Sequence, residues 1–116
     1  MDLQTFLERI GQDDSLEFQH SIEVIQRHYD YQPTGFDNGS LRNEAGQNEG
    51  SCKIFSFARL NDLDPHQTLA CFGGFYRDVL KAPQGSDHGN IRAFMASGWD
   101  GIRFDGQALT PKASRA

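Results

Sequence analysis

The segment from residue 52 to residue 60 would be apolar on nearly every side if it formed a helix. Its polar side chains, Lys53, Ser56 and Arg59, make only a narrow stripe along one edge. The other large or apolar positions are Ile54, Phe55, Phe57, Ala58 and Leu60. A helix with so little polar surface is typical of the buried centre of a domain, and Ser51 is a suitable N-cap for it. The sequence therefore predicts a small domain in which other elements surround this helix.

Further segments show the apolar spacing of amphipathic helices. They cover residues 2–10, residues 16–29, a segment from Asp64-Pro65 past Val79, and a segment from Ser86 or Asp87 to Gly98. The Asp-Pro pair favours a helix start, because aspartate caps the first turn and proline fits within it. Gly73 and Gly74 lie inside the third of these segments, where each costs about 1 kcal/mol relative to alanine. We expect the helix to continue through them.

Two short, similar sequences predict β-hairpins. Residues 36–41 contain the pair Asn38-Gly39, which readily adopts the positive φ angles of a tight hairpin turn. Residues 104–109 repeat the pattern with Asp105-Gly106. The sequence therefore predicts one α+β domain over residues 1–109, with about five helices packed against a small antiparallel sheet of two hairpins. Residues 110–116 are expected to form a flexible C-terminal tail.

Length and charge limit the class of protein. The 116 residues suffice for one domain, and 11 Lys and Arg against 16 Asp and Glu give a net charge of −5. This acidity argues against nucleic acid or an anionic membrane as a partner. No stretch approaches the roughly 18 apolar residues of a membrane span. With no recognisable secretory signal, we expect a cytoplasmic protein whose two cysteines are reduced.

Cys52 is the strongest candidate for a catalytic residue. It falls in the first turn of the predicted central helix, where the helix dipole and the free N–H groups stabilise a thiolate. His88 could act as its base, with Asn48 or Asn90 orienting the imidazole, as in thiol hydrolases. The alternative is that Cys52 is a small buried apolar residue, which is the commoner role of a free cysteine.

Two helix starts are rich in amide side chains and carry a positive charge. Residues 43–53 precede and begin the central helix, and residues 87–92 begin the last helix. Their backbone N–H groups could hold a carboxylate or a phosphate. The candidate ligand-binding residues are Asn43, Glu44, Gln47, Asn48, Ser51, Lys53, Asn90 and Arg92. The alternative is structural: amide side chains that satisfy backbone groups in a loop, and an aspartate that caps a helix.

The histidines and cysteines do not have the spacing of a metal site. His20 and His28 lie eight positions apart in a predicted helix, and neither Cys52 nor Cys71 belongs to a zinc-binding pattern. We therefore expect no structural metal and no cofactor.

Several separate motifs together resemble the HopJ type III effector family over residues 1–110. They are NEAGQNEGSCKIF at residues 43–55, TLACFG at 68–73, YR at 76–77, DHGNIR at 87–92, GW at 98–99 and FDGQAL at 104–109. The resemblance implies a small mixed α/β domain. It implies no catalytic residue and no cofactor, and it implies secretion into a host cell only if the effector name applies literally.

Two functions remain open at this point. The first is a non-enzymatic binding module that engages a protein partner, since no complete catalytic motif is present. The second is a cytosolic domain whose two amide-rich helix starts form a polar pocket that binds or transforms a small anionic metabolite. The second requires the two helix starts to lie on the same side of the molecule.

Overall fold

Helix α3 (Glu49–Leu60) runs through the middle of the computed structural model, which describes residues 1–112. The segment from Ile54 to Ala58 is buried throughout. Phe55 lies at the centre of the aromatic core, where its ring packs against those of Phe36, Phe72, Phe94 and Trp99. This placement confirms the prediction that the apolar helix is surrounded by the rest of the domain.

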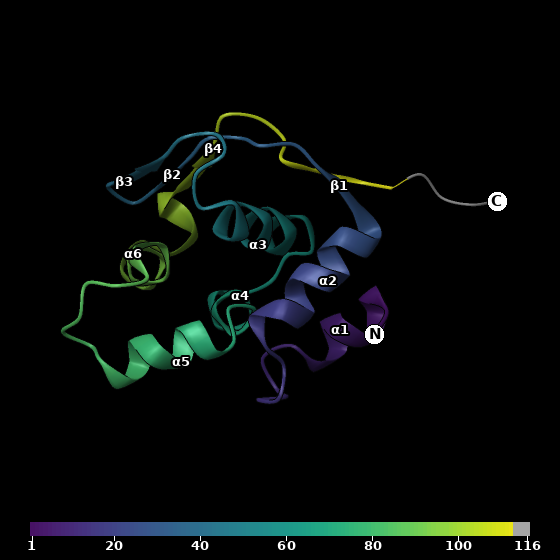
Figure 1. The fold of residues 1–116 in the computed structure, drawn as a ribbon, viewed down its shortest axis with the longest axis horizontal. Coiled ribbons are helices and arrows are strands. Elements are labelled where there is room, and N and C mark those ends of the chain that lie inside the picture. Colours follow the sequence, from purple (N-terminus) through teal and green to yellow (C-terminus); the bar gives the residue numbers. More distant parts are fainter. Residues whose placement is uncertain (113–116) are drawn as a thin grey trace.

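The other helices and the strands enclose α3 from different sides. The helices are α1 (Leu3–Arg9), α2 (Phe18–His28), α4 (Pro65–Ala70), α5 (Gly74–Lys81) and α6 (Gly89–Ser97), followed by the 3-10 turn η1 (Gly98–Gly101). In Figure 1, the strands lie above α3, α4 and α5 lie below it, and α2 and α6 lie on its two sides. The fold is therefore the expected α+β domain.

The glycine pair after α4 breaks the helix that the sequence predicts to be continuous. Gly73 has a φ of +56°, and a Cβ atom there would lie 2.6 Å from the backbone nitrogen of Phe18 and 2.7 Å from Cα of Glu17. The backbone entering α2 thus occupies the space that a side chain would need. Glu17 also accepts a hydrogen bond from the Gly74 N–H at 2.8 Å. As a result residues 1–112 contain six α-helices where the sequence predicts about five.

The first predicted hairpin is confirmed. Strand β2 (Phe36–Asn38) pairs antiparallel with β3 (Leu41–Asn43), and Gly39 in the turn has a φ of +62°.

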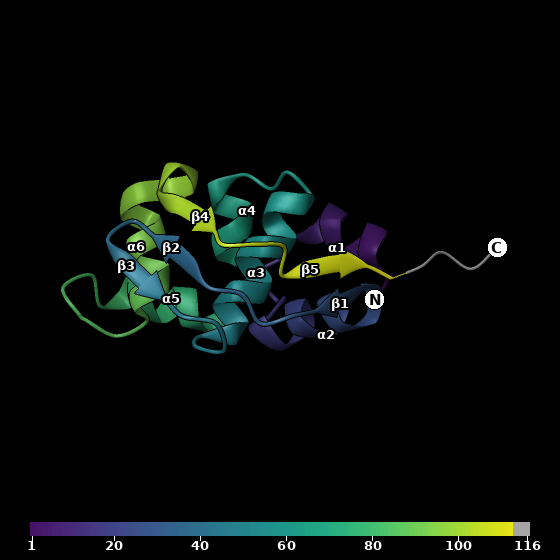
Figure 2. The same ribbon diagram turned by 90° about the horizontal axis from the view of Figure 1, so that it is seen from above.

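The second predicted hairpin is wrong. Strands β4 (Ile102–Phe104) and β5 (Leu109–Pro111) pair with two other strands, β4 with β2 and β5 with β1 (Tyr29–Tyr31). The connecting segment stays alongside residues 29–38: the Asp105 N–H donates to the Gly35 carbonyl at 3.0 Å, and the Gln32 N–H donates to the Ala108 carbonyl at 2.8 Å. Because these bonds keep the segment beside residues 29–38, it does not fold back on itself. Figure 2 shows both strand pairs lying across the same side of the molecule.

Strand β5 extends beyond the expected end of the domain. Thr110 and Pro111, which the sequence places in a flexible tail, lie opposite Asp30 and Tyr29 in the β1–β5 pair. Residues 113–116 of the expected tail lie outside the described residues. Within residues 1–112, no helix is both long enough and apolar enough to span a membrane.

Candidate functional site

Helix α3 begins three residues earlier than its sequence suggests. Asn48 is the N-cap, with left-handed backbone angles of φ 50° and ψ 49°, and Ser51 is the third helical residue, not the cap. Asparagine adopts this conformation more readily than most residues. The Asn48 side chain makes no capping hydrogen bond. The N–H groups of the first turn are therefore not used by the cap residue.

Helix α6 begins in the same way. Its N-cap is His88, with φ 52° and ψ 52°, not Ser86 or Asp87 as predicted from the sequence. The His88 side chain makes no capping hydrogen bond either. Two helices of this domain thus start from a left-handed cap residue with a first turn that its side chain leaves open.

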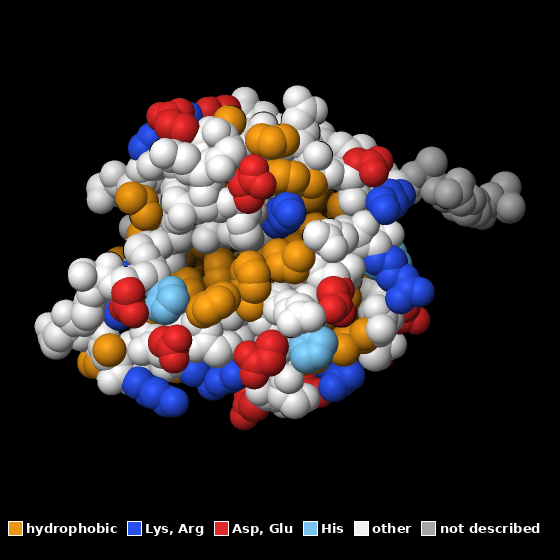
Figure 3. Space-filling view, in the orientation of Figure 1, with side chains coloured by type: hydrophobic (Ala, Val, Ile, Leu, Met, Phe, Trp, Pro, Cys, Tyr) orange, Lys and Arg blue, Asp and Glu red, His pale blue; other side chains and the backbone are white. Residues whose placement is uncertain are grey.

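The two helix starts meet at one cavity. It has a volume of about 240 Å³ and is lined by Phe18, Asn48, Gly50, Ser51, Phe72, Phe75, His88, Gly89, Asn90 and Ile91. These residues come from the starts of α2, α3 and α6, the turn between α4 and α5, and the first turn of α5. In Figure 3, hydrophobic side chains line a hollow between α3 and α5. The condition set by the pocket hypothesis, that both helix starts lie on the same side, is met.

An asparagine cluster, made of Asn38, Asn43, Asn48 and Asn90, holds the two helix starts together. Asn90 Nδ2 donates to Asn43 Oδ1 at 2.9 Å, and Asn43 Nδ2 donates to Asn90 Oδ1 at 3.0 Å. Asn48 Nδ2 donates to Asn43 Oδ1 at 2.7 Å, which ties the start of α3 to the same pair. Asn38 Nδ2 donates to the backbone and side-chain oxygens of Asn90, at 2.8 and 3.0 Å. The cluster joins α3, α6 and the β2–β3 hairpin.

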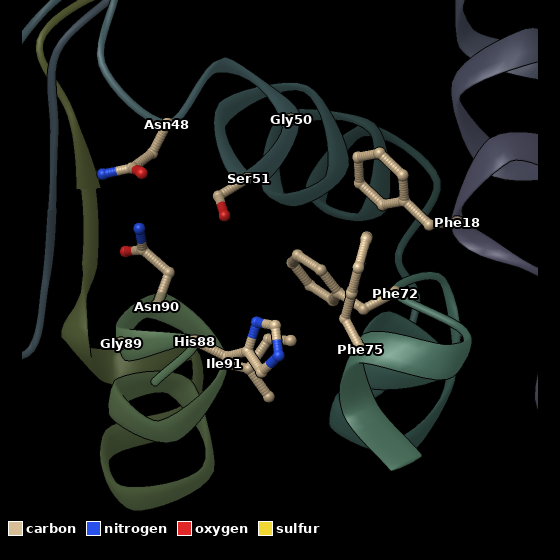
Figure 4. A pocket seen from close by; sticks show the side chains of 10 residues that line it. All are labelled: Phe18, Asn48, Gly50, Ser51, Phe72, Phe75, His88, Gly89, Asn90 and Ile91. Carbon is tan, nitrogen blue, oxygen red and sulfur yellow. The ribbon is translucent and has the colours of Figure 1, made fainter. Parts of the chain in front are cut away.

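The groups on this side form the polar wall of the cavity: Asn48, Ser51, His88, Gly89 and Asn90. Nε2 of His88 lies 3.7 Å from a carboxylate oxygen of Asp78 and 3.7 Å from one of Asp87. In Figure 4, the other ring nitrogen of His88 and the Ser51 hydroxyl both face the space between the walls. The polar wall therefore presents hydrogen-bonding groups from two helices to one volume.

Three phenylalanines form the opposite, aromatic wall: Phe18, Phe72 and Phe75. The ring of Phe18 contacts that of Phe75 edge to face, with centroids 5.2 Å apart, and stacks on that of Phe72 at 6.5 Å. Phe72 is buried, but Phe75 remains 43% exposed. Gly50 makes room for this wall, because a Cβ atom there would lie 2.7 Å from Cζ of Phe18. Figure 4 shows the three rings facing the polar wall.

Cys52 does not line the cavity. Its side chain is buried, and its thiol donates to the Thr34 carbonyl at 3.4 Å. Burial raises the pKa of this thiol, whereas the Cys/His hypothesis requires a lowered pKa. The Cys71 thiol is fully buried as well, and burial raises its pKa to about 12. The structure therefore does not support a dyad of Cys52 and His88, because the Cys52 thiol is part of the core.

The two cations that the sequence places at the helix starts also lie away from the cavity. The Lys53 ammonium lies 4.7 Å from the centroid of the Tyr31 ring. The Arg92 guanidinium bonds to the side chain of Asp87 at 2.6 Å and to its backbone carbonyl at 2.6 Å. The helix starts, and not Lys53 or Arg92, thus supply positive potential to the cavity.

Glu44 and Gln47 belong to the turn before α3. The Gln47 side chain accepts a hydrogen bond from the Glu44 N–H at 3.0 Å, and the Glu44 carboxylate pairs with Arg42 at 3.4 Å. For these two residues the structural alternative describes the contacts that are present. Of the eight candidate ligand-binding residues, Asn48, Ser51 and Asn90 line the cavity, and Asn43 supports it from behind.

Sequence reasoning missed Asn38 and the whole aromatic wall. Asn38 was assigned to the hairpin turn, yet its side chain is fully buried against Asn90. Phe18, Phe72 and Phe75 have the helical spacing of core residues, and no local pattern marks Phe75 as exposed. Within residues 1–112, no group of three or more His, Cys, Asp or Glu side chains is placed to hold a metal ion.

Comparison with known proteins gives a family and a related structure. The family model described as "HopJ type III effector protein" matches residues 3–109. The chain is also similar to a protein solved as "Crystal structure of unknown function protein VPA0580", with 51% sequence identity and a TM-score of 0.93. The match covers 97% of this chain and 95% of that one. Comparison with curated proteins finds no match.

Proposed function

This chain belongs to the HopJ type III effector protein family, and we propose that it is a non-enzymatic binding domain whose cavity holds the anionic group of a small molecule. The observation that carries the proposal is the meeting of the α3 and α6 starts at one cavity of about 240 Å³. The effector part of the family name does not enter the proposal, which rests on the site alone.

Helix N-termini attract anions for two reasons. Their first N–H groups have no acceptor within the helix, and the aligned peptide dipoles place roughly half a positive charge at each N-terminus. Helix α3 has 12 residues and α6 has 9, so both are long enough to develop this potential. Because both starts border the same cavity, their potentials add at a bound anion.

Side chains of the polar wall complement the backbone groups. The Ser51 hydroxyl and one ring nitrogen of His88 face the cavity in Figure 4. Asp78 and Asp87, whose carboxylates would repel an anion, lie near Nε2 of His88, on the other edge of its ring. The amides of Asn43 and Asn90 bond to each other, so they fix the donors in place before a ligand arrives.

A binding role is favoured over catalysis by the state of the nucleophile candidate. The Cys52 thiol is buried and its pKa is raised, so it is a poor nucleophile. The proposed domain therefore holds its ligand without forming a covalent bond to this thiol.

The test is an NMR titration of the full chain with sodium acetate and, separately, with sodium phosphate. We expect the backbone amide signals of the first turns of α3 and α6 to shift together and to saturate. The decisive variant is Ser51→Asp, which places a carboxylate in the first turn of α3. An acid there stabilises the helix while occupying the anion position, so binding should be lost and the melting temperature kept or raised.

The matched control is Gln84→Asp, which makes the same charge change at an exposed position in the α5–α6 connection. It should leave the titration unchanged. Equal weakening by both variants would mean that only the overall charge matters, and the proposal would fail. Absence of any saturating shift in the unmodified protein would also reject it, in favour of a protein partner.

A further inference from the structure

We infer that the ligand of this cavity is a small aromatic carboxylate, with its ring on the aromatic wall and its carboxylate at the polar wall. This inference rests on the proposed function and names the chemical class of the ligand. It depends on four features of the cavity: the open face of Phe75, the arrangement of the two walls, the volume between them, and the charge that the polar wall can balance.

Phe75 supplies the first reason, because its ring is open to a ligand. It is 43% exposed, although phenylalanine is among the residues most often buried. The ring sits edge to face with that of Phe18 and also lies beside that of His88, with centroids 5.4 Å apart. An aromatic group placed in the cavity could make offset or edge-to-face contacts with these rings, the geometries that aromatic pairs prefer. Part of the aromatic wall is therefore exposed and available to contact a ligand ring.

The arrangement of the walls supplies the second reason. In Figure 4, Phe18, Phe72 and Phe75 lie on one side, Asn48, Ser51 and Asn90 on the other, and His88 between them. A ligand that fills this space must be apolar at one end and polar at the other. A wholly polar anion would leave the phenylalanines facing water, and a wholly apolar ligand would cover the polar wall without hydrogen bonds.

The size of the cavity limits the ligand further. Its volume of about 240 Å³ lies below the range of roughly 300–1,000 Å³ that is usual for drug-sized ligands. A single ring with a short acidic side chain is therefore favoured over a nucleotide or a long acyl chain.

The charge that the site can balance favours a monoanion. No lysine or arginine is among the lining residues. Two helix N-termini of roughly half a positive charge each together match at most one negative charge. Glu49 in the first turn of α3, and Asp78 and Asp87 beside His88, already place carboxylates near them, which weighs further against a dianion. A carboxylate carries that charge, whereas a phosphate monoester is closer to a dianion at neutral pH.

The experiment compares four probes on the full chain by NMR titration: phenylacetate, acetate, benzyl alcohol and inorganic phosphate. We expect phenylacetate to bind at least about tenfold more tightly than acetate, because the ring gains aromatic contacts and apolar burial. Benzyl alcohol should bind weakly, since it lacks the charge. Signals of both the first turns and the Phe75 ring should shift with phenylacetate, and only those of the first turns with acetate.

The variant Phe75→Ala separates the two walls. It should remove the preference for phenylacetate and leave acetate binding as it was. Leu80→Ala is the matched control, because Leu80 is on the same helix and is 53% exposed, but is not a lining residue. It should change neither affinity. A circular dichroism melt of each variant establishes that it is folded.

The outcomes distinguish this inference from the proposed function. Equal affinities for phenylacetate and acetate would overturn the aromatic ligand and leave the anion site intact. Tighter binding of phosphate than of phenylacetate would likewise overturn the ligand class. Benzyl alcohol binding as tightly as phenylacetate would overturn the anion site itself, and with it the inference.

Discussion

The two walls of the cavity differ in how firmly their side chains are held. In the polar wall, Asn90 is buried and both ends of its amide are bonded to Asn43. In the aromatic wall, Phe72 is buried but Phe75 is 43% exposed. Asn90 is thus held in place before any ligand binds, while the edge of the aromatic wall has room to adjust.

The difference follows from the energetics of burial. A buried amide that lacks a partner costs free energy, which favours asparagines that bond to one another or to the backbone. Within the cluster, Asn38 Oδ1 is buried and has no hydrogen-bond partner. An aromatic ring suffers no such penalty when it is partly uncovered, and it retains the contacts it has. The comparison teaches that, in this site, hydrogen-bond geometry is built into the fold and apolar area is left for the ligand.

The largest effect is expected from Asn90→Ala, which breaks the polar wall. It leaves the buried Nδ2 of Asn43 without the acceptor it has in the structure. Leaving a buried polar group unpaired, together with the lost hydrogen bonds, should cost about 3 kcal/mol of unfolding free energy. Urea unfolding measures it. Gln84→Ala, which removes an exposed amide, should cost less than about 0.5 kcal/mol. A similar cost for both variants would mean that the cluster is not a rigid support.

A smaller effect is expected where the two walls meet at Gly50. Because a Cβ atom there would lie 2.7 Å from Cζ of Phe18, Gly50→Ala must displace that ring. We expect a loss of about 1 kcal/mol, since a side chain can yield where backbone cannot. Gly89→Ala is the matched change at the start of α6, where the Cβ atom would meet only Cδ2 of Leu41, at 3.6 Å. That variant should be neutral or slightly stabilising. Thermal melts of the two variants test the contrast, and equal melting temperatures would contradict it.

A still smaller effect concerns Glu17, which links half-buried Phe18 to exposed Phe75. Its carboxylate accepts from the Gly74 N–H, one residue before Phe75, and it directly precedes Phe18. That hydrogen bond and the Arg77 guanidinium lower the pKa of Glu17 below its ordinary value of 4.5. A lowered pKa means that ionised Glu17 stabilises the folded state at pH values above 4.5, and that this contribution is lost as the pH falls through the folded-state pKa.

Glu17→Gln should therefore lower the melting temperature slightly at pH 7 and make it less sensitive to pH below 4.5. The matched change Glu8→Gln, on α1, removes one carboxylate away from the aromatic wall and serves as the control. Melting temperatures measured from pH 7 to pH 3 give the comparison. An unchanged pH profile for Glu17→Gln would show that this carboxylate does not hold the aromatic wall.

The smallest effect is expected for chemical labelling of Cys52, which follows Ser51 in α3 but is buried in the core. Since burial raises the pKa of its thiol, iodoacetamide should not label it in the folded protein at pH 7. Peptide mass spectrometry after labelling in buffer and in urea provides the measurement, with labelling only in urea as the expected result. Rapid labelling of Cys52 in the folded protein, slowed by His88→Gln, would restore the Cys/His hypothesis.

The sequence allowed the two helix starts to be identified as parts of one site, because their amides and glycines are local signals. It could not reveal how they are held. The burial of Asn38 follows from the pairing of β2 with β4, a contact between distant parts of the chain. The exposed Phe75 lies just after the helix break at Gly73, where the backbone of Glu17 and Phe18 approaches too closely for a side chain. Neither of these long-range contacts can be predicted from the local spacing of residues.

The prediction that Lys53 and Arg92 contribute positive charge to the site was wrong for a related reason. Lys53 and Arg92 stand beside the right residues in the sequence, but a helix turns successive side chains to different faces. Lys53 therefore lies on Tyr31, and Arg92 on Asp87. The prediction of a second hairpin was wrong for a similar reason. Asp105-Gly106 permits a tight turn without requiring one, and β4 and β5 pair with the distant strands β2 and β1 instead.

The pairing of β1 with β5 has a consequence for how the chain matures on the ribosome. Tyr29 lies opposite Pro111, and Phe36 lies opposite Phe104, so both strand pairs join an early segment to a late one. During synthesis, residues 29–38 emerge long before residues 102–111, so their backbone N–H and C=O groups toward β4 and β5 have no strand partner during that time. Because contacts between distant residues slow folding, and unpaired edges invite association with other chains, this interval is when the nascent protein is most vulnerable to aggregation.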